Sequence, residues 1–224
     1  MNFDTFVLAA ATATLDDEPA AREHADAIEF RMDLAEDPLS QLRTYDGELP
    51  IIATNRAEWE GGEASRPGRL DALAEAAQVS AVEAIDVELH TLETPEGVAI
   101  AENVRAAEIP IIASVHDFER TPSSADLRKL LRRASKHGDI GKLAVTAQTS
   151  RDVLDLLGAT QAISATGRTV ATMAMGKVGR HSRAVAPLYG SRIGYAPVDP
   201  ADATAPGQYD LATLRTLVDQ LRSE

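Results

Sequence analysis

The fold that the sequence predicts is a (β/α)8 (TIM) barrel, an α/β architecture in a single domain over residues 1–224. Seven short apolar segments and a weaker eighth recur with the composition of buried parallel strands, and amphipathic helical patterns lie between them. A doubly wound open sheet is the alternative, but no glycine-rich phosphate turn follows the first segment. A barrel carries its chemistry inside, at the carboxyl ends of its strands or on the loops that follow. Polar residues at those places are therefore the candidate functional residues.

The predicted strands are short and rich in Ile, Val and Ala, as buried parallel strands are. In chain order they cover FVLAAATA (6–13), AIEFRMDL (27–34), PIIATNR (50–56), AIDVEL (84–89), PIIASVH (110–116), IGKLAVTA (140–147) and RTVATMAM (168–175), with RIGYAPV (192–198) as the weak eighth.

The clearest helix is predicted over TPSSADLRKLLRRASKHG (121–138). Thr121 can cap it, Pro122 suits its first turn and Gly138 can end it. Its apolar stripe consists of Leu127, Leu130, Leu131 and Ala134. Further helices are predicted within 66–78, 151–160 and 211–224, the last with Leu211, Leu214, Val218 and Leu221 on one face.

Charge and composition limit the function classes. The chain has 35 Asp+Glu against 22 Lys+Arg, a net charge of −13, which disfavours nucleic-acid binding because a phosphate backbone needs a basic face. No apolar run approaches the ~20 residues of a membrane span, and no basic region precedes the first apolar stretch, as a signal peptide would require. Cysteine is absent, so disulfides and thiolate metal sites are excluded, and a cytoplasmic location is expected.

The acidic residues are spread along the chain, and only four of the cationic residues are lysine. This composition resembles that of proteins from salt-loving microbes such as halophilic archaea; an ordinary acidic surface is the alternative. Halophilic adaptation predicts that the free energy of unfolding rises steadily as KCl is raised into the molar range. Denaturant titrations at a series of KCl concentrations measure this, and full stability in dilute buffer contradicts it.

Polar side chains interrupt two of the buried strands. Lys142 lies within IGKLAVTA, although an unpaired ammonium in a dry core costs several kcal/mol. Glu29 and Arg31 share one face of AIEFRMDL while Phe30 and Met32 share the other. The apolar pair suits helix packing, which points Glu29 and Arg31 into the barrel. A buried ion pair with a purely structural role remains an equal alternative.

His116 is the only histidine at the carboxyl end of a predicted apolar strand, where a barrel carries its catalytic residues. A satisfied core histidine is the alternative. After the third strand, Arg56 and Glu60 lie four residues apart, followed by Gly61 and Gly62. That segment alone favours a solvated ion pair in a loop. No HxH, HExxH or carboxylate–histidine spacing marks a metal site.

The loops after the last two strands are polar. MAMGKVGRHSR (173–183) offers Arg183, whose guanidinium can hold a carboxylate through two parallel hydrogen bonds; a flexible surface loop is the alternative. ATAPGQ (203–208) contains Thr204 and Gln208 and fits either a lid or a plain turn.

Together these residues suggest one chemistry. Burial disfavours the charged form of a lysine, and a neutral amine can attack a ketone to form a Schiff base. A histidine at the same mouth can move protons near neutral pH, and arginines imply an anionic substrate. Neither a metal nor a nucleotide cofactor is needed, because the iminium is itself the electron sink.

Six segments also carry a family resemblance: EFRMDL, TNRAEWEGGE, SVHDFERTP, GKLAV, MGKVGRHSR and APGQ. In this order they resemble the type I 3-dehydroquinate dehydratases, the third enzymes of the shikimate pathway to chorismate and the aromatic amino acids. The resemblance covers nearly the whole chain. It implies a barrel, a homodimer and no cofactor.

By this resemblance, Lys142 forms a Schiff base with the C3 carbonyl of 3-dehydroquinate. His116 removes a C2 proton and then protonates the departing C1 hydroxyl, giving 3-dehydroshikimate by syn elimination. Glu60 matches the acid that orients and tunes the histidine.

The resemblance also implies which residues bind substrate. Arg183 matches the cation that holds the substrate carboxylate. The remaining binding residues that it implies are Glu29, Arg31 and Arg56 around the ring hydroxyls, and Thr204 and Gln208 in a lid. Thr204 stands where the family usually has serine, which keeps the hydroxyl.

Two other functions stay open from the residues alone. A class I aldolase also carries a Schiff-base lysine, but aldolases of phosphorylated sugars need a phosphate site after strands seven and eight. Arg183 and Gln208 suit a carboxylate better. A barrel that binds a metabolite without turnover is the second alternative, and it is disfavoured because Lys142, His116 and Glu60 are all present.

Overall fold

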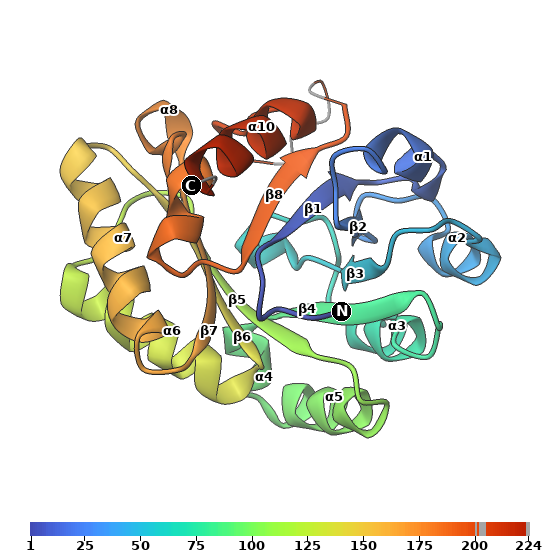
Figure 1. The fold of residues 1–224 in the computed structure, drawn as a ribbon. Coiled ribbons are helices and arrows are strands. Elements are labelled where there is room, and N and C mark those ends of the chain that lie inside the picture. The colour runs from blue at the N-terminus through green and yellow to red at the C-terminus, as the bar shows by residue number, and fades with distance from the viewer. Residues whose placement is uncertain (200, 202–204, 223–224) are drawn as a thin grey trace.

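The computed structural model describes residues 1–199, 201 and 205–222, which form a nearly closed (β/α)8 barrel (Figure 1). Eight parallel strands follow one another in the order β7-β6-β5-β4-β3-β2-β1-β8. Their bounds are β1 Val7–Thr12, β2 Ala27–Arg31, β3 Ile51–Thr54, β4 Val82–Glu88, β5 Ile111–Asp117, β6 Ile140–Thr146, β7 Thr169–Met175 and β8 Ile193–Pro197. Every predicted strand is confirmed, including the weak eighth. The Arg192 amide donates to the Val170 carbonyl at 2.8 Å and brings β8 against β7.

Helices surround this sheet on its outer side (Figure 1). Their bounds, with η for 3-10 helices, are η1 Leu15–Asp17, α1 Glu18–Ala21, α2 Pro38–Thr44, η2 Glu58–Glu60, α3 Arg69–Ala76, α4 Leu89–Leu92, α5 Pro95–Ala106, α6 Ser124–His137, α7 Ser150–Ser164, α8 Gly176–Gly179, α9 Ser182–Val185, η3 Ala186–Tyr189 and α10 Leu211–Arg222. The four predicted helices correspond to α3, α6, α7 and α10. Helix α5 was not predicted, because its buried face is small and gives a weak apolar pattern; it consists of Gly97, Ile100, Ala101 and Val104. No helix in the described part of the chain is long and apolar enough to cross a membrane.

Helix α6 begins later than its sequence suggests. Ser123, and not Thr121, is the N-cap, because the Ser123 hydroxyl accepts a hydrogen bond from the Asp126 amide at 3.2 Å. Thr121 instead donates its hydroxyl to the Thr146 carbonyl at 2.9 Å and so fastens the approach to the helix against β6. Gly138 ends the helix, as predicted.

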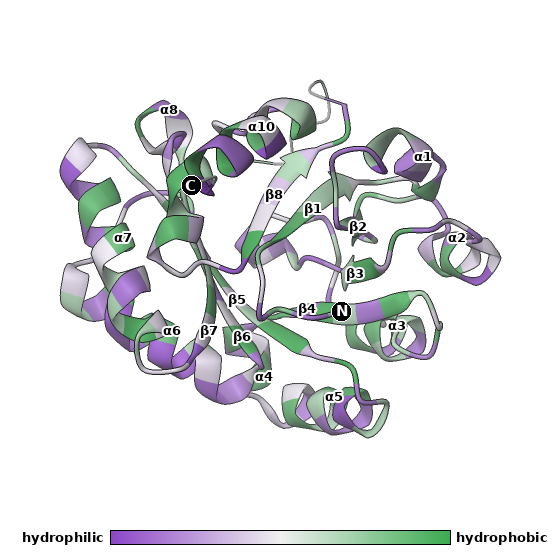
Figure 2. Cartoon of the chain, viewed as in Figure 1, coloured by the Kyte–Doolittle hydropathy of each residue, from purple (hydrophilic) through white to green (hydrophobic). Residues whose placement is uncertain are grey.

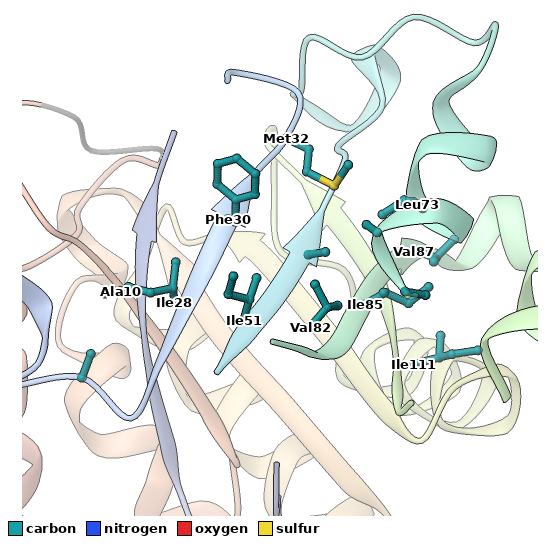
Figure 3. Close-up of a cluster of buried hydrophobic side chains, with 14 of the residues drawn as sticks. Ala10, Ile28, Phe30, Met32, Ile51, Leu73, Val82, Ile85, Val87 and Ile111 are labelled. Atoms are coloured by element: carbon teal, nitrogen blue, oxygen red, sulfur yellow. The ribbon is translucent and has the colours of Figure 1, made fainter. Parts of the chain in front are cut away.

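The core consists of apolar layers on the two sides of the sheet. One outer cluster joins β1 to β5 with helix α3 and includes Phe30, Ile51, Leu73 and Ile85 (Figure 3). Another lies under α6 and α7. The hydropathy pattern agrees: the strands are mostly apolar and the helices are polar on their outer faces (Figure 2).

Inside the barrel, side chains change character along the strand direction. The apolar interior cluster includes Phe3, Val7, Ile52, Ile112, Ile140 and Ile193, towards the amino ends of the strands. Two or four residues further along the same faces come polar side chains: Glu29, Thr54, Asp86, Ser114, His116 and Lys142. The amino end is therefore a packed floor, and the chemistry is confined to the carboxyl end.

Candidate active site

Strand register sets the height of the two central groups. Strand β6 pairs with β5 so that Lys142 lies beside Ser114, and Ala144 lies beside His116. His116 is therefore two residues nearer the carboxyl end than Lys142, about 7 Å along the strands. A small ring can lie between the amine and the imidazole.

Lys142 is 4% exposed but is not unpaired. Its Nζ donates to Asp86 Oδ2 at 2.8 Å and to Glu29 Oε1 at 3.5 Å. Two buried carboxylates therefore compensate the ammonium that this otherwise apolar strand places in the core. Glu29 in turn accepts a hydrogen bond from the Thr54 hydroxyl at 3.2 Å.

Asp86 is the first of a row of buried side chains whose charges alternate in sign. Its Oδ1 accepts from Arg56 at 2.8 Å and from the Ser114 hydroxyl at 2.6 Å. Arg56 also donates to Glu88 at 2.9 Å, and Glu88 accepts from Arg69 at 2.8 Å. Arg56 is thus buried within the barrel, and the solvated ion pair with Glu60 that its own segment favoured is wrong.

These neighbouring charges shift the pKa values of Asp86 and Arg56. Burial opposes ionisation of Asp86, but Arg56 and Lys142 outweigh it and hold the pKa of this carboxyl well below its usual value. Burial likewise opposes the charge of Arg56, and Asp86 and Glu88 raise its pKa in spite of it. Asp86 is therefore a fixed anion beside the Lys142 ammonium.

Glu29 and Arg31 both point into the cavity, as the alternation predicted. They do not pair with each other: Arg31 forms two hydrogen bonds to Asp33, at 2.8 and 2.6 Å. Burial lowers the pKa of Arg31, but Asp33 and Glu29 raise it overall. The internal Glu29–Arg31 ion pair considered from sequence is therefore replaced by two separate contacts.

His116 and Glu60 form a close pair. Nδ1 of His116 lies 2.8 Å from Glu60 Oε2, and the His116 amide donates to the same oxygen at 3.2 Å. The two glycines make this possible: Gly61 has φ +77°, and a Cβ at Gly62 would collide with the Arg56 carbonyl. The turn brings Glu60 back over the end of β5.

Burial perturbs both members of this pair. It raises the pKa of Glu60 to about 8, against the opposing field of Arg56. Burial, Arg56 and Lys142 together lower the pKa of His116 well below its usual value. The pair is therefore one neutral imidazole beside a carboxyl group that ionises near neutral pH, as suits a proton-transfer site.

Arg183 is the cavity's uncompensated cation. It is 4% exposed in α9, and its Nε has no hydrogen-bond partner among the described residues, which also pair no carboxylate with it. Its Nη2 donates to the Pro206 carbonyl at 3.5 Å. Burial lowers its pKa to about 10, so it stays charged at neutral pH. An anionic group entering the cavity would supply the missing partner.

Residues 205–208, beyond β8, lie over the cavity. The Gly176 amide donates to the Pro206 carbonyl at 3.1 Å, and a Cβ at Gly207 would meet the Gly176 backbone. Gln208 lines the cavity and accepts from the Ala205 amide at 3.1 Å. Thr204, the other predicted lid residue, lies outside the described residues.

Most of these groups line one cavity, whose water-accessible volume is about 60 Å³. Of the predicted site residues, the cavity is lined by Glu29, Arg31, Arg56, His116, Lys142, Arg183 and Gln208. Glu60 joins them through His116.

Sequence reasoning undervalued or missed several residues of the site. Asp86 and Glu88 gave only a weak signal, their shared face on the fourth strand. Ser114 gave none, nor did Phe118 and Tyr195, which also line the cavity. Alternation along the strands could have placed Ser114 and Tyr195 inside the barrel, but not beside Arg56 or Lys142.

Comparisons with known proteins assign the chain to a family. Residues 6–224 match the family model for type I 3-dehydroquinase. The chain is 58% identical to the 3-dehydroquinate dehydratase of Haloarcula marismortui over the whole of both chains. It is 51% identical to that of Halobacterium salinarum over 99% of this chain and all of the relative. Because these relatives come from halophilic archaea, they support the interpretation of the acidic, lysine-poor composition as a halophilic one.

Solved structures give the same result. The crystal structure of 3-dehydroquinate dehydratase from Geobacillus kaustophilus superposes with a TM-score of 0.85 at 27% identity, covering 97% of this chain and 92% of that one. The type I enzyme from Clostridium difficile, determined with covalently modified comenic acid, gives 0.84 at 27% identity and the same coverage. The chain belongs to the type I 3-dehydroquinase family.

Proposed function

We propose that this chain dehydrates 3-dehydroquinate to 3-dehydroshikimate through an imine on Lys142, with His116 as general acid and base. The observation that carries the proposal is the placement of a buried lysine and a Glu60-paired histidine on neighbouring strands of one cavity. The family supplies the reaction, a lyase step of the shikimate pathway.

The first stage forms the imine. The Lys142 ammonium passes a proton to a nearby base, and Glu29 Oε1 is the carboxylate within reach that Arg56 does not hold. The amine attacks the C3 carbonyl, and its second proton moves to the carbonyl oxygen to give a neutral carbinolamine. The proton held by Glu29 then leaves with the carbinolamine hydroxyl as water, which gives the protonated iminium. Asp86, fixed by Arg56 and Ser114, then faces the iminium cation.

The second stage eliminates water. The iminium acidifies the C2–H bond, and His116 Nε2 takes the proton while Nδ1 remains with Glu60. The electron pair forms the C1–C2 double bond, and the C1 hydroxyl leaves as water with the proton that His116 returns. Hydrolysis of the imine releases the enone and restores Lys142.

The other residues bind and order the substrate. Arg183 holds the carboxylate, and Glu29 and Arg31 contact ring hydroxyls, while Arg56 orders the charges beneath them. Thr204 and Gln208 act as the lid. The homodimer and the cytoplasmic location stay predictions, as does the absence of any cofactor.

Arg183→Leu is expected to raise KM for 3-dehydroquinate by about 100-fold, because a buried charge-assisted pair with the substrate carboxylate is lost. Its thermal midpoint should stay level or rise, because no carboxylate of the described residues depends on Arg183. Steady-state kinetics and thermal denaturation measure the two effects. An unchanged KM contradicts the assignment, and Arg180→Leu is the control in the same loop.

The decisive experiment traps the intermediate. The chain is incubated with 3-dehydroquinate, borohydride is added, and the adduct is mapped by mass spectrometry. Enone formation with an adduct on Lys142 supports the proposal, whereas enone without an adduct contradicts the imine. If 3-dehydroquinate is inert and a sugar phosphate is cleaved, the aldolase alternative is correct. Stoichiometric binding without product indicates a barrel that only binds its ligand.

A further inference from the structure

Tyr195 of β8 lies against the reacting nitrogen. Lys142 Nζ is 4.0 Å from the centroid of the Tyr195 ring, and both side chains are 4% exposed. The contact is made by the face of the ring, where the π-electrons concentrate negative potential. Lys142 therefore has three neighbours that favour positive charge: Asp86, Glu29 and this ring.

The hydroxyl of Tyr195 does not explain its presence. It is buried and has no hydrogen-bond partner among the described residues. A buried hydroxyl without a partner costs free energy, so the polar atom adds nothing to this contact. Burial, with Glu29 and Asp86 nearby, raises the pKa of Tyr195 well above its usual value and keeps the phenol neutral. The aromatic ring is therefore the part of Tyr195 that acts on Lys142.

The ring and the carboxylates respond differently to imine formation. An ammonium has three N–H donors and can bond Asp86 and Glu29 together, as it does here. A protonated iminium is planar and has one N–H, so at most one of these hydrogen bonds survives. Attraction to the ring depends on the charge and not on the number of N–H groups. It is therefore lost in the neutral amine and carbinolamine and is regained in full when the iminium forms.

We propose that the face of the Tyr195 ring stabilises the protonated iminium on Lys142 relative to the neutral carbinolamine and the neutral imine, and so favours dehydration of the carbinolamine and keeps the imine in its protonated, reactive form. This rests on the proposed function, because it needs an imine on Lys142. Tyr195 is then a catalytic residue that acts through its ring and not through its hydroxyl.

The test varies the ring electrons at nearly constant shape. Tyr195→Phe removes the unpartnered hydroxyl, keeps the ring and is the reference for the series. Phenylalanines carrying one, two and three fluorines at the same position weaken the ring face stepwise. Both kcat and the borohydride-trapped fraction on Lys142 should fall along the series, by about tenfold from Tyr195→Phe to the trifluoro ring. The thermal midpoint should stay constant along the series, because fluorination changes the ring electrons and hardly the shape of the ring.

A matched series at Phe30 is the control. Phe30 is fully buried in the outer cluster behind β2, away from the cavity, and its fluorination should leave kcat unchanged. If the unsubstituted chain forms the adduct but the Tyr195 series is flat, the role of the ring is overturned and the imine stands. If the unsubstituted chain makes product without an adduct, the imine and this proposal both fall.

Discussion

Replacing Lys142 with alanine is expected to abolish the borohydride-trapped adduct and to lower kcat by a factor on the order of 10⁵, as loss of a covalent nucleophile does. No other amine can take over, because the remaining lysines, Lys129, Lys136 and Lys177, do not line the cavity. The measurements are kcat with 3-dehydroquinate and mass mapping of the reduced adduct.

The same change has a structural consequence that must be separated from the chemical one. Without the ammonium, Glu29 and Asp86 face each other's charge in a buried site, although Asp86 keeps Arg56 and Ser114. We expect a loss of about 3 kcal/mol in the free energy of unfolding, the low end of the cost of removing one partner of a buried pair.

Two controls make the Lys142 result decisive. Lys129 is an exposed lysine on α6, and Lys129→Ala should retain both the adduct and kcat. Lys142→Arg keeps a cation for Asp86 but offers a guanidinium that stays protonated, so it should fold well and remain inactive. Substantial turnover by Lys142→Ala, with the chain folded, would show that the amine is not the nucleophile.

Local patterns were sufficient to predict the barrel. A parallel barrel buries each strand on both faces, so its strands appear as continuous apolar runs. The run ending at His116 and the run around Lys142 have this form, and both are strands in the structure. The start of α6 was less predictable, because Thr121 and Ser123 are both good caps. The choice depends on the Thr146 carbonyl, which is distant in sequence.

The candidate site was predictable only where one strand carries the information. Alternation places Glu29 and Arg31 inside the barrel without knowledge of any other strand. The partner of Lys142 cannot be found that way, because Asp86 is 56 residues earlier and on β4, separated from β6 by β5. Arg56 shows the same limit: four residues from Glu60 in sequence, it pairs instead with Asp86 and Glu88 on the neighbouring strand β4.

His116→Ala is expected to lower kcat by a factor on the order of 10³ while the adduct on Lys142 still forms. The two effects separate because imine formation uses the amine, whereas elimination needs a base for the C2 proton and an acid for the hydroxyl. Single-turnover trapping should show the imine accumulating with unreacted substrate. Near-normal kcat would remove His116 from proton transfer, and loss of the adduct would assign it to imine formation instead.

The pH dependence tests how Glu60 controls this base. Below about pH 8 Glu60 is protonated and donates to Nδ1, so the neutral imidazole carries its own proton on Nε2 and cannot accept another. Above that pH the carboxylate accepts from Nδ1–H and frees the Nε2 lone pair. We therefore expect kcat/KM to rise with pH through a midpoint near 8, which belongs to the coupled pair. Glu60→Gln cannot ionise and should flatten the profile between about pH 6 and 9. A midpoint that persists in Glu60→Gln would assign the titration to another group.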